Sequence, residues 1–403
     1  MSDSTTTPPP DARRAWRPFL LLAPFQFIFG LIFSWGAIAP ALHSQAGWSH
    51  ATLSLAFSLT PLALFPAVIL AGRLLGRLSP KALLAAALAL FTLGSAGALS
   101  GAAPLIFMIG YDVLALGVAA GLSTAACIAM VGALYPARRG TLAGALLALY
   151  GLSSIVSAPV FDTLDAHLGW RLALAVLLGG YAALGWLTWL GLPDARPSAK
   201  RRTAARTPPR RSLAHPGLLR AVTSVLAAAP LGALSFAVIG QLARAQGLGR
   251  ADAVAIVAVM AFGNGLGRFA FGLLADRRGA PFSRTTVLTL NALAALLAFA
   301  DLYRPSPVAL AAYATLAGLS YGGIAGKLPP LAAHLAGPAQ EHAAFGLLYG
   351  TYALGSFLGP LLGALIGLRP ALTVVACAAL FALLPACFDD RKRGDSAHHD
   401  PAA

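Results

Sequence analysis

The chain has 403 residues, of which 58% are apolar and only 11% are charged, and its mean hydropathy is +0.75. Soluble domains carry about 25% charged residues, so this composition excludes an ordinary soluble protein and predicts an integral membrane protein. The formal net charge of +15 raises the alternative of a nucleic-acid-binding surface. The basic residues lie in tails and loops without interleaved aromatic residues, so we expect no nucleic-acid partner.

Twelve continuous apolar stretches follow one another along the chain, and each is long enough to form a spanning helix of about 20 residues. Their centres lie near residues 30, 62, 90, 118, 151, 181, 231, 263, 292, 320, 353 and 378. The stretches are rich in Leu, Ala and Gly and do not alternate apolar with polar residues, which favours helices over a β-barrel. We therefore predict an all-α integral membrane fold of twelve transmembrane helices in two six-helix halves.

Polar segments mark the boundaries of these halves. The expected parts are an N-terminal tail (1–18), a first six-helix bundle (19–192), a basic linker (193–216), a second six-helix bundle (217–388) and a C-terminal tail (389–403). The N-terminal tail is polar and rich in proline, so we expect it to be disordered and to contain no cleavable signal peptide.

The placement of Lys and Arg predicts the orientation in the membrane. If both termini are cytoplasmic, the tails and inner loops hold 22 of the 29 basic residues, and the outer loops hold five. Cytoplasmic loops of membrane proteins carry such an excess of positive charge. We therefore expect a multi-pass protein of the plasma membrane, the inner membrane in a bacterium, with both termini in the cytoplasm. The remaining basic residues, Arg268 and Lys327, lie inside spans.

The two halves repeat each other in sequence. The segment GRLLGRLSPK begins at Gly72, after the second span, and GLLADRRGAP begins 200 residues later at Gly272, after the eighth span. A second match, ALYGL around Tyr150 and LLYGT around Tyr349, has an offset of 199 residues. Tandem repeats of this kind place a transport site at mid-membrane between the halves.

The segment GLLADRRG resembles the loop signature of the major facilitator superfamily, Gly-x-x-x-Asp-Arg-x-Gly. Its signature residues are Gly272, Asp276, Arg277 and Gly279. The copy in the first half keeps Gly72 and Arg77. Gly76 stands where the family has aspartate, so this copy lacks the acidic member of the charged latch that the family forms between helix ends.

Four longer stretches narrow the resemblance. They are FSWGAIAPALHSQAGWSHATLSLAFSL in the first two spans, LYPARRGTLAGALLALYGLSS entering the fifth, GNGLGRFAFGLLADR in the eighth and YGGIAGKLPPLAAHLAG in the tenth. Together they resemble the oxalate/formate antiporter and monocarboxylate transporter group. The resemblance implies secondary active transport of small organic anions, mono- or dicarboxylates, by alternating access, through exchange or proton coupling. It also implies that Arg268, the arginine of the eighth span, binds the carboxylate.

Physical reasoning about Arg268 leads to the same expectation. Arg268 lies eight residues before Asp276, which we place at the cytoplasmic end of the span, so it lies about 12 Å inside a core roughly 30 Å thick. An arginine at mid-span costs about 2.5–3.5 kcal/mol to insert and usually faces a water-filled cavity. Its planar fork of donors fits a carboxylate bidentately. The alternatives are an arginine that snorkels to the interface or bonds backbone carbonyls.

Lys327 is a second cation at nearly the same depth, about eight residues before the cytoplasmic end of the tenth span. Pro329 and Pro330 follow it, and because a pair of prolines removes backbone donors, we expect the helix to break here. Oxalate exchangers of the resembled group place their second cation in the eleventh span, which is uncharged here. Three roles stay open for Lys327: a second cation for a dicarboxylate, a lysine that exchanges a proton, or a structural lysine bonded to carbonyls.

Asp112 is the only acidic residue well inside a span, about 12 Å from the outer end of the fourth. A carboxylate inside the membrane can carry a coupling proton, or it can serve as a structural hydrogen-bond acceptor. Aromatic and polar side chains are expected to line the cavity and to contact the anion. These are Gln26, Trp35, Tyr150, Asn264, Tyr321, Tyr349 and Tyr352.

The remaining chemistry is sparse. The three cysteines lack metal-ligand spacing, and the sequence contains no phosphate loop, paired catalytic carboxylates or nucleophile elbow. We therefore expect no metal, no cofactor and no enzymatic activity, and a carrier that functions as a monomer in the bilayer. The alternative functions are a drug or metabolite efflux carrier of the same fold, which would favour neutral or cationic substrates, and a transporter-like sensor.

Overall fold

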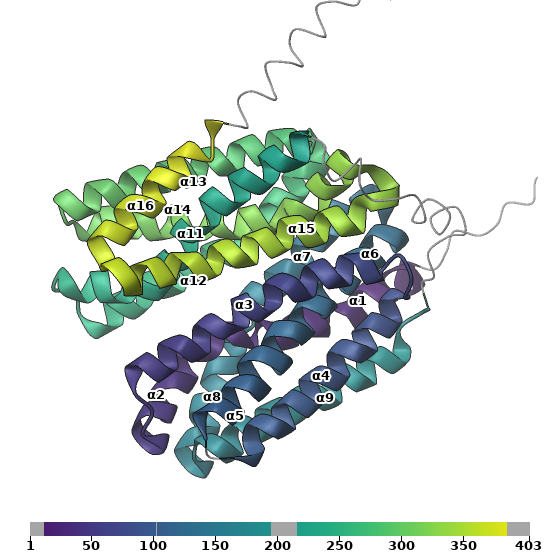
Figure 1. Ribbon diagram of the computed structural model, residues 1–403, viewed down its shortest axis with the longest axis horizontal. Coiled ribbons are helices and arrows are strands. Elements are labelled where there is room, and N and C mark those ends of the chain that lie inside the picture. Colours follow the sequence, from purple (N-terminus) through teal and green to yellow (C-terminus); the bar gives the residue numbers. More distant parts are fainter. Residues whose placement is uncertain (1–11, 102, 195–215, 385–403) are drawn as a thin grey trace, which may run out of the picture.

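The computed structural model describes residues 12–101, 103–194 and 216–384, and every element in these ranges is a helix. Figure 1 shows the two halves of the chain as two helical bundles that lie side by side. Most of the predicted N-terminal tail and linker, and all of the C-terminal tail, lie outside the described residues. The first helix begins at Ala12, so residues 12–18, which we expected to belong to the tail, are helical.

Several consecutive helices build some spans of the first half. The helices are α1 (Ala12–Phe29), η1 (Gly30–Ser34), α2 (Trp35–Ala46), α3 (His50–Leu74), α4 (Pro80–Ser100), α5 (Pro104–Phe107), η2 (Met108–Val118), α6 (Ala119–Leu134), η3 (Pro136–Arg138), α7 (Arg139–Leu152), α8 (Ser154–Leu168) and α9 (Trp170–Gly191). The first, fourth and fifth spans are therefore interrupted, and only the second, third and sixth are single helices.

The second half is more regular. Its helices are α11 (Pro216–Ala245), α12 (Arg250–Arg278), α13 (Ala280–Tyr303), α14 (Pro307–Gly326), α15 (Leu328–Ile366) and α16 (Leu368–Phe381). Within α15 the chain bends at Gly337, whose φ of 68° lies in the left-handed region that glycine tolerates. The tenth span therefore consists of α14 and the first part of α15, and the eleventh is the rest of α15.

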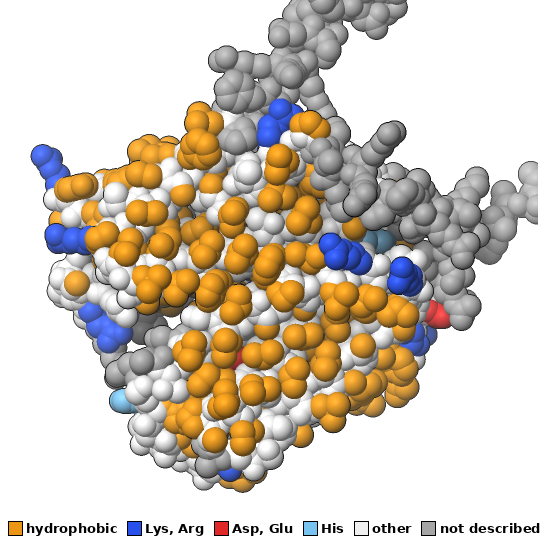
Figure 2. All heavy atoms as spheres, in the orientation of Figure 1, with side chains coloured by type: hydrophobic (Ala, Val, Ile, Leu, Met, Phe, Trp, Pro, Cys, Tyr) orange, Lys and Arg blue, Asp and Glu red, His pale blue; other side chains and the backbone are white. Residues whose placement is uncertain are grey.

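The number of spans agrees with the prediction. Eleven segments of the described residues are long and apolar enough to cross a membrane, and a twelfth, Leu368–Phe381, is apolar but shorter. Each predicted centre lies in one of them, so the prediction of twelve transmembrane helices is confirmed. Figure 2 shows apolar side chains over the flanks of both bundles. Large apolar side chains such as Leu93, Leu187 and Leu190 are mostly exposed, as suits flanks that face lipid.

Two spans depart from regular α-helix where charged residues lie. In the tenth span, α14 ends at Gly326 and Lys327 forms a turn, so the predicted break is present. Its cause is the proline pair that follows, because Pro329 and Pro330 have no N–H to donate to the preceding carbonyls. In the fourth span, η2 is a π-helix that contains Asp112. Such wide turns occur frequently at functional sites.

The two halves contact each other mainly through the pairs α7–α12 and α3–α15. Gly144 of α7 lies directly against the backbone of Arg268, and Gly346 of α15 lies against the backbone of Val68 in α3. Gly346 follows Gly144 by 202 residues, and Arg268 follows Val68 by 200. The two contacts are therefore equivalent, and the repeat predicted from the sequence is present in the packing.

This register changes one match between the halves. The fifth and eleventh spans are related by an offset of 202 residues, so the counterpart of Tyr150 is Tyr352 and not Tyr349. The second and eighth spans are related by an offset of 200 residues. The two offsets differ because the segment from the eighth span to the eleventh is two residues longer than the segment from the second span to the fifth.

Candidate functional site

Arg268 lies in the middle part of α12 and is 1% exposed. Its Nε donates a hydrogen bond of 3.2 Å to the side-chain oxygen of Asn264, one turn earlier on the same helix. The guanidinium carbon lies 5.5 Å from the ring centre of Tyr150, which belongs to α7 in the first half. The cation therefore lies at the boundary between the halves and faces an aromatic ring of the other half.

Three tyrosines of the second half surround the same guanidinium. Tyr321, Tyr349 and Tyr352 are its electrostatic neighbours. The ring centres of Tyr321 and Tyr352 are 5.0 Å apart, and those of Tyr349 and Tyr352 are 5.6 Å apart. The hydroxyls of Tyr321 and Ser356 are hydrogen-bonded at 2.8 Å. The structure thus brings five predicted residues together around Arg268, and their role in binding stays a prediction.

Two phenylalanines extend this aromatic cluster, and sequence reasoning did not single them out. Phe33 of η1 lies 5.7 Å from Tyr150 and 6.2 Å from Phe236 of α11, between ring centres. Phe236 lies 5.7 Å from Tyr321. An apolar ring inside an apolar span carries little signal of its own. Phe33 does begin the first of the four stretches that carry the family resemblance, which is the one feature that could have indicated it.

One nitrogen of the Arg268 guanidinium is unused. Nη1 is buried and has no hydrogen-bond partner among the described residues. A buried donor without a partner costs about 1–3 kcal/mol, and more when the group is charged, so such groups usually bind water, an ion or a ligand. Asn264 occupies Nε, so Nη1 is a donor that remains available for an anion between the halves.

Two other predicted cavity residues lie elsewhere in the first half. Gln26 of α1 is fully buried and lies within reach of the Cys127 thiol on α6. Trp35 of α2 packs against Tyr111, with 6.3 Å between ring centres. Neither of these contacts involves Arg268, so the participation of Gln26 and Trp35 in the site stays a prediction.

Lys327 lies at the level of Arg268, as the number of residues between Lys327 and the end of its span predicted. Gly326 is so close to the backbone of Arg268 that a Cβ atom would collide with it, which holds the neighbouring Lys327 at this level. The ammonium is fully buried, and Arg284 of α13 is an electrostatic neighbour. The 22 basic residues assigned from the sequence to the tails and inner loops include Arg284. That assignment is wrong, because α13 begins at Ala280 and Arg284 is 4% exposed.

Asp112 is buried in the first half, in the π-helix of the fourth span. The hydroxyl of Thr60 on α3 donates a hydrogen bond of 3.3 Å to Oδ1. Oδ2 has no hydrogen-bond partner among the described residues. Asp112 is therefore half satisfied, and both predicted roles, proton carrier and structural acceptor, stay open.

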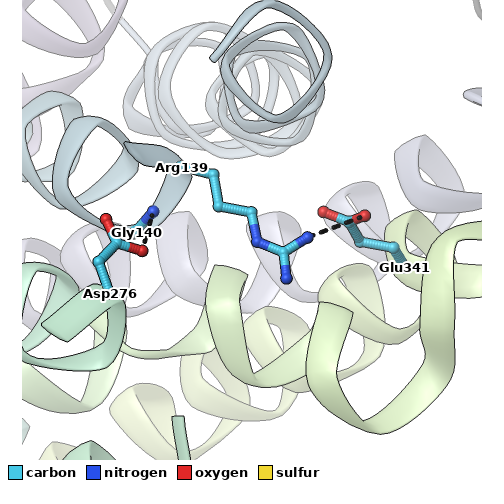
Figure 3. A network of polar contacts seen from close by, with 4 residues as sticks. All are labelled: Arg139, Gly140, Asp276 and Glu341. Atoms are coloured by element: carbon cyan, nitrogen blue, oxygen red, sulfur yellow. Dashed lines mark hydrogen bonds and ion pairs between the residues drawn. The ribbon is translucent and has the colours of Figure 1, made fainter. Parts of the chain in front are cut away.

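We call the end of the molecule at which α9 ends and α11 begins the linker end. Here Asp276 accepts hydrogen bonds from the start of α7. The backbone N–H of Gly140 donates one at 3.0 Å (Figure 3). The N–H and hydroxyl of Thr141 donate two more, at 2.6 and 2.8 Å. A carboxylate at this position also faces the positive end of the helix dipole. Asp276 therefore joins α12 of the second half to α7 of the first.

The other signature residues shape the helix ends. Gly279 ends α12 with a φ of 91°, which favours glycine. Gly272 packs against α7, and Gly72 packs against α15 in the equivalent position. Arg77 and Arg277 are exposed.

The first half has no counterpart of Asp276, since Gly76 occupies that position, but an ion pair joins the halves nearby. Arg139 Nη1 of α7 lies 3.7 Å from Glu341 Oε2 of α15, and Figure 3 shows the two side chains extending toward each other. Arg139 and Glu341 are 202 residues apart, so they are counterparts in the repeat. Two carboxylates, Asp276 and Glu341, thus join the halves at the linker end, and Asp276 belongs to the signature.

The chain thus forms two helical bundles that meet around a buried arginine and are joined at one end. This is the architecture of a membrane transporter. The sequence model of the Major Facilitator Superfamily matches residues 20–240 and 220–402, and the chain belongs to this family. No curated protein sequence matches the chain significantly.

Solved structures of transporters share the fold. FucP in the outward conformation, a transporter of this superfamily, is 19% identical with a TM-score of 0.66, and the match covers 92% of this chain and 98% of that one. The proton:xylose symporter XylE bound to 6-bromo-6-deoxy-D-glucose is 14% identical with a TM-score of 0.69, covering 93% and 95%. A second structure of FucP, the E. coli fucose:proton symporter, is 18% identical with a TM-score of 0.66, covering 92% and 98%. Identities this low show a common fold and leave the substrate open.

Proposed function

We propose that the chain is a secondary active carrier of small organic anions, mono- or dicarboxylates, that works by alternating access. The observation that carries this proposal is Arg268 Nη1, a buried charged donor without a partner at the boundary between two halves of a transporter fold. A carboxylate matches both its charge and its planar donor geometry. Snorkelling does not fit a side chain that is 1% exposed, and Nε bonds a side-chain amide rather than a carbonyl of the backbone.

The proposed site is small and amphipathic. The guanidinium binds the carboxylate, Tyr349 and Tyr321 supply hydroxyl groups, and the rings of Tyr150 and Phe33 enclose the carbon skeleton. A compact acid with a short skeleton suits this enclosure better than a large drug. The resemblance to the oxalate/formate antiporter and monocarboxylate transporter group supports the same substrate class.

Two modes of coupling fit this site. In exchange, the empty site holds an uncompensated buried charge, which makes reorientation without an anion unfavourable, so one anion leaves as another enters. In proton coupling, we propose Asp112 as the proton carrier because its Oδ2 is buried and unbonded. Thr60 then orients the carboxyl group through Oδ1.

We further propose that the linker end is cytoplasmic and that the protein functions as a monomer in the plasma membrane, the inner membrane in a bacterium. The excess of Lys and Arg in the loops of this end supports the orientation. In the described state the bonds of Asp276 and the pair Arg139–Glu341 keep this side shut. Release of the substrate into the cytoplasm requires both to break.

The test is uptake by the purified protein in proteoliposomes, with empty liposomes and the Arg268→Gln variant as controls. The panel contains oxalate, malonate, formate and lactate, together with fucose, xylose and a lipophilic cation. Uptake of carboxylates that internal carboxylate or a pH gradient accelerates supports the proposal. Uptake of a sugar or the cation without any carboxylate contradicts it, and binding of an acid without uptake indicates a sensor.

A further inference from the structure

An aromatic contact joins Phe33 of η1 in the first half to Phe236 of α11 in the second, with 6.2 Å between ring centres. Each ring also contacts a tyrosine of the proposed site. Phe33 lies 5.7 Å from Tyr150, and Phe236 lies 5.7 Å from Tyr321. The four rings therefore form a continuous bridge across the boundary between the halves, on which Arg268 also lies.

Both phenylalanines lie on the side of the site away from the linker end. α11 begins at the linker end, and so does α1, because six spans separate the start of α1 from the end of α9. Phe33 follows Gly30 by three residues, and Phe236 follows Gly232 by four. A Cβ at either glycine would collide with the tyrosine that its phenylalanine contacts. Each phenylalanine is therefore about one helical turn beyond its tyrosine.

The exposure of the side chains changes at this level. Arg268 and the four tyrosines around it are 1–6% exposed, whereas Phe33 and Phe236 are partly exposed. Gly36 lies one turn farther from the linker end, on the face of the helix that carries Phe33. It is exposed, and a Cβ there would meet no atom within 4 Å. The two rings thus separate the buried site from open space beyond it.

This contact is easier to open than the linker end. It joins two apolar rings that have no hydrogen-bonding group, whereas Asp276 accepts three hydrogen bonds from the start of α7 at the linker end. Phe33 also belongs to η1, a 3₁₀-helix of five residues between α1 and α2. A 3₁₀ segment inside a longer helix often marks a hinge. The rings are therefore placed to part while the linker end stays closed.

We propose that Phe33 and Phe236 form the outer gate of the site and limit the size of the acid that enters it. The inference rests on the proposed function only for the identity of the substrate. A small acid with a short skeleton passes when the rings part slightly, and an acid with an aromatic skeleton requires a wider opening. The rings offer no partner to a carboxylate, so they select by size and leave the binding of charge to Arg268.

Thiol modification of the purified full-length protein in lipid nanodiscs tests this proposal without a substrate. The three native cysteines are replaced by alanine, and Asn264→Cys places a thiol one turn from Arg268 in the buried site. Methyl methanethiosulfonate and the larger benzyl methanethiosulfonate are both neutral, so Arg268 attracts neither. Phe33→Ala and Phe236→Ala should each accelerate modification at least about tenfold, and more for the benzyl reagent. The matched control Phe262→Ala, at a 60% exposed position of α12, should leave both rates unchanged.

Two results would overturn the proposal: unchanged rates in both Phe33→Ala and Phe236→Ala, or the same acceleration in Phe262→Ala. Equal acceleration of the two reagents overturns the size limit. If Asn264→Cys does not fold, Gly151→Cys supplies the same measurement, because a Cβ at Gly151 lies 3.4 Å from the Asn264 amide and 3.6 Å from Arg268 Nε. Since no acid is bound or transported here, a failure of the carrier proposal and a failure of the gate remain distinguishable.

Discussion

Arg268 and Tyr150 come from different halves of the chain, and the guanidinium carbon of one lies 5.5 Å from the ring centre of the other. The contact is buried on both sides, since neither residue is appreciably exposed. A movement that separates the halves at this level must break it. The contact therefore links the environment of Arg268 to the approach of the two bundles.

The ring of Tyr150, rather than its hydroxyl, should matter for transport. Tyr150→Phe keeps the aromatic face toward Arg268, so we expect near-normal affinity for the carboxylate. Tyr150→Leu removes a cation–π contact worth about 0.5–2 kcal/mol, which corresponds to a roughly 2- to 30-fold weaker affinity. Substrate titrations of the two purified variants make the comparison. Equal losses in both would assign the role to the hydroxyl instead.

Arg268→Lys keeps the charge and loses the planar fork together with the bond to Asn264. We expect this variant to fold and insert, and carboxylate uptake to fall at least about tenfold, because a lysine cannot bind a carboxylate bidentately. The matched control is Arg278→Lys, the same change at an exposed position of α12, which should leave uptake unchanged. Normal uptake by Arg268→Lys would remove Arg268 from the substrate site.

Asp112→Asn separates the two modes of coupling. The amide preserves the bond from Thr60 but cannot exchange a proton, so accumulation driven by a pH gradient should disappear while exchange between preloaded substrates persists. Thr60→Val is the control, since it removes the bond and leaves the carboxyl group. Accumulation that is unchanged in Asp112→Asn would leave Asp112 with a structural role only.

The latch at the linker end should depend more on Asp276 than on Arg139. Asp276 is itself exposed, but it accepts bonds from two backbone amides, and each such bond contributes about 0.5–1.5 kcal/mol net. Arg139 is 36% exposed and 3.7 Å from Glu341, and exposed pairs contribute about 0–1 kcal/mol. Hydrogen exchange of the peptide 136–152 should therefore accelerate at least about tenfold in Asp276→Ala and little in Arg139→Gln. The reverse order would make the ion pair the main latch.

The depth of a residue along its helix could be predicted from the sequence. The direction in which its side chain points from the helix could not. Each residue adds 1.5 Å of rise, so the common level of Arg268 and Lys327 follows from counting residues to the helix end. The contact of Arg268 with Asn264 follows from their spacing of four residues. The direction of Lys327 depends on how α14 is rotated, and the packing of Gly326 on α12 sets that rotation.

Apolar patterns located the spans because a bilayer requires about 20 apolar residues for each crossing. The same rule assigned Arg284 to a loop, because a cation near the end of a span resembles a loop residue in the sequence. Its position inside α13 becomes clear only when the neighbours of this helix are known. Glu341 was missed for a related reason. Its pairing with Arg139 requires α7 and α15 to approach each other, and only the assembly of the two halves brings that about.

The last prediction concerns Lys327. It distinguishes a substrate site that binds one carboxylate group from a site that binds two. A dicarboxylate that bridged Arg268 and Lys327 would lose a buried charge partner in Lys327→Thr, which should weaken oxalate at least about tenfold and spare formate. Gly323, one turn before Lys327, packs against Phe271 and Val287 inside the second half, whereas Arg268 faces Tyr150 between the halves. We therefore expect the affinities for oxalate and formate to change by similar factors, within about threefold. Calorimetric titration of wild type, Lys327→Thr and Arg268→Gln measures both, and Arg268→Gln should lose both acids. A selective loss of oxalate in Lys327→Thr would place Lys327 in the substrate site after all.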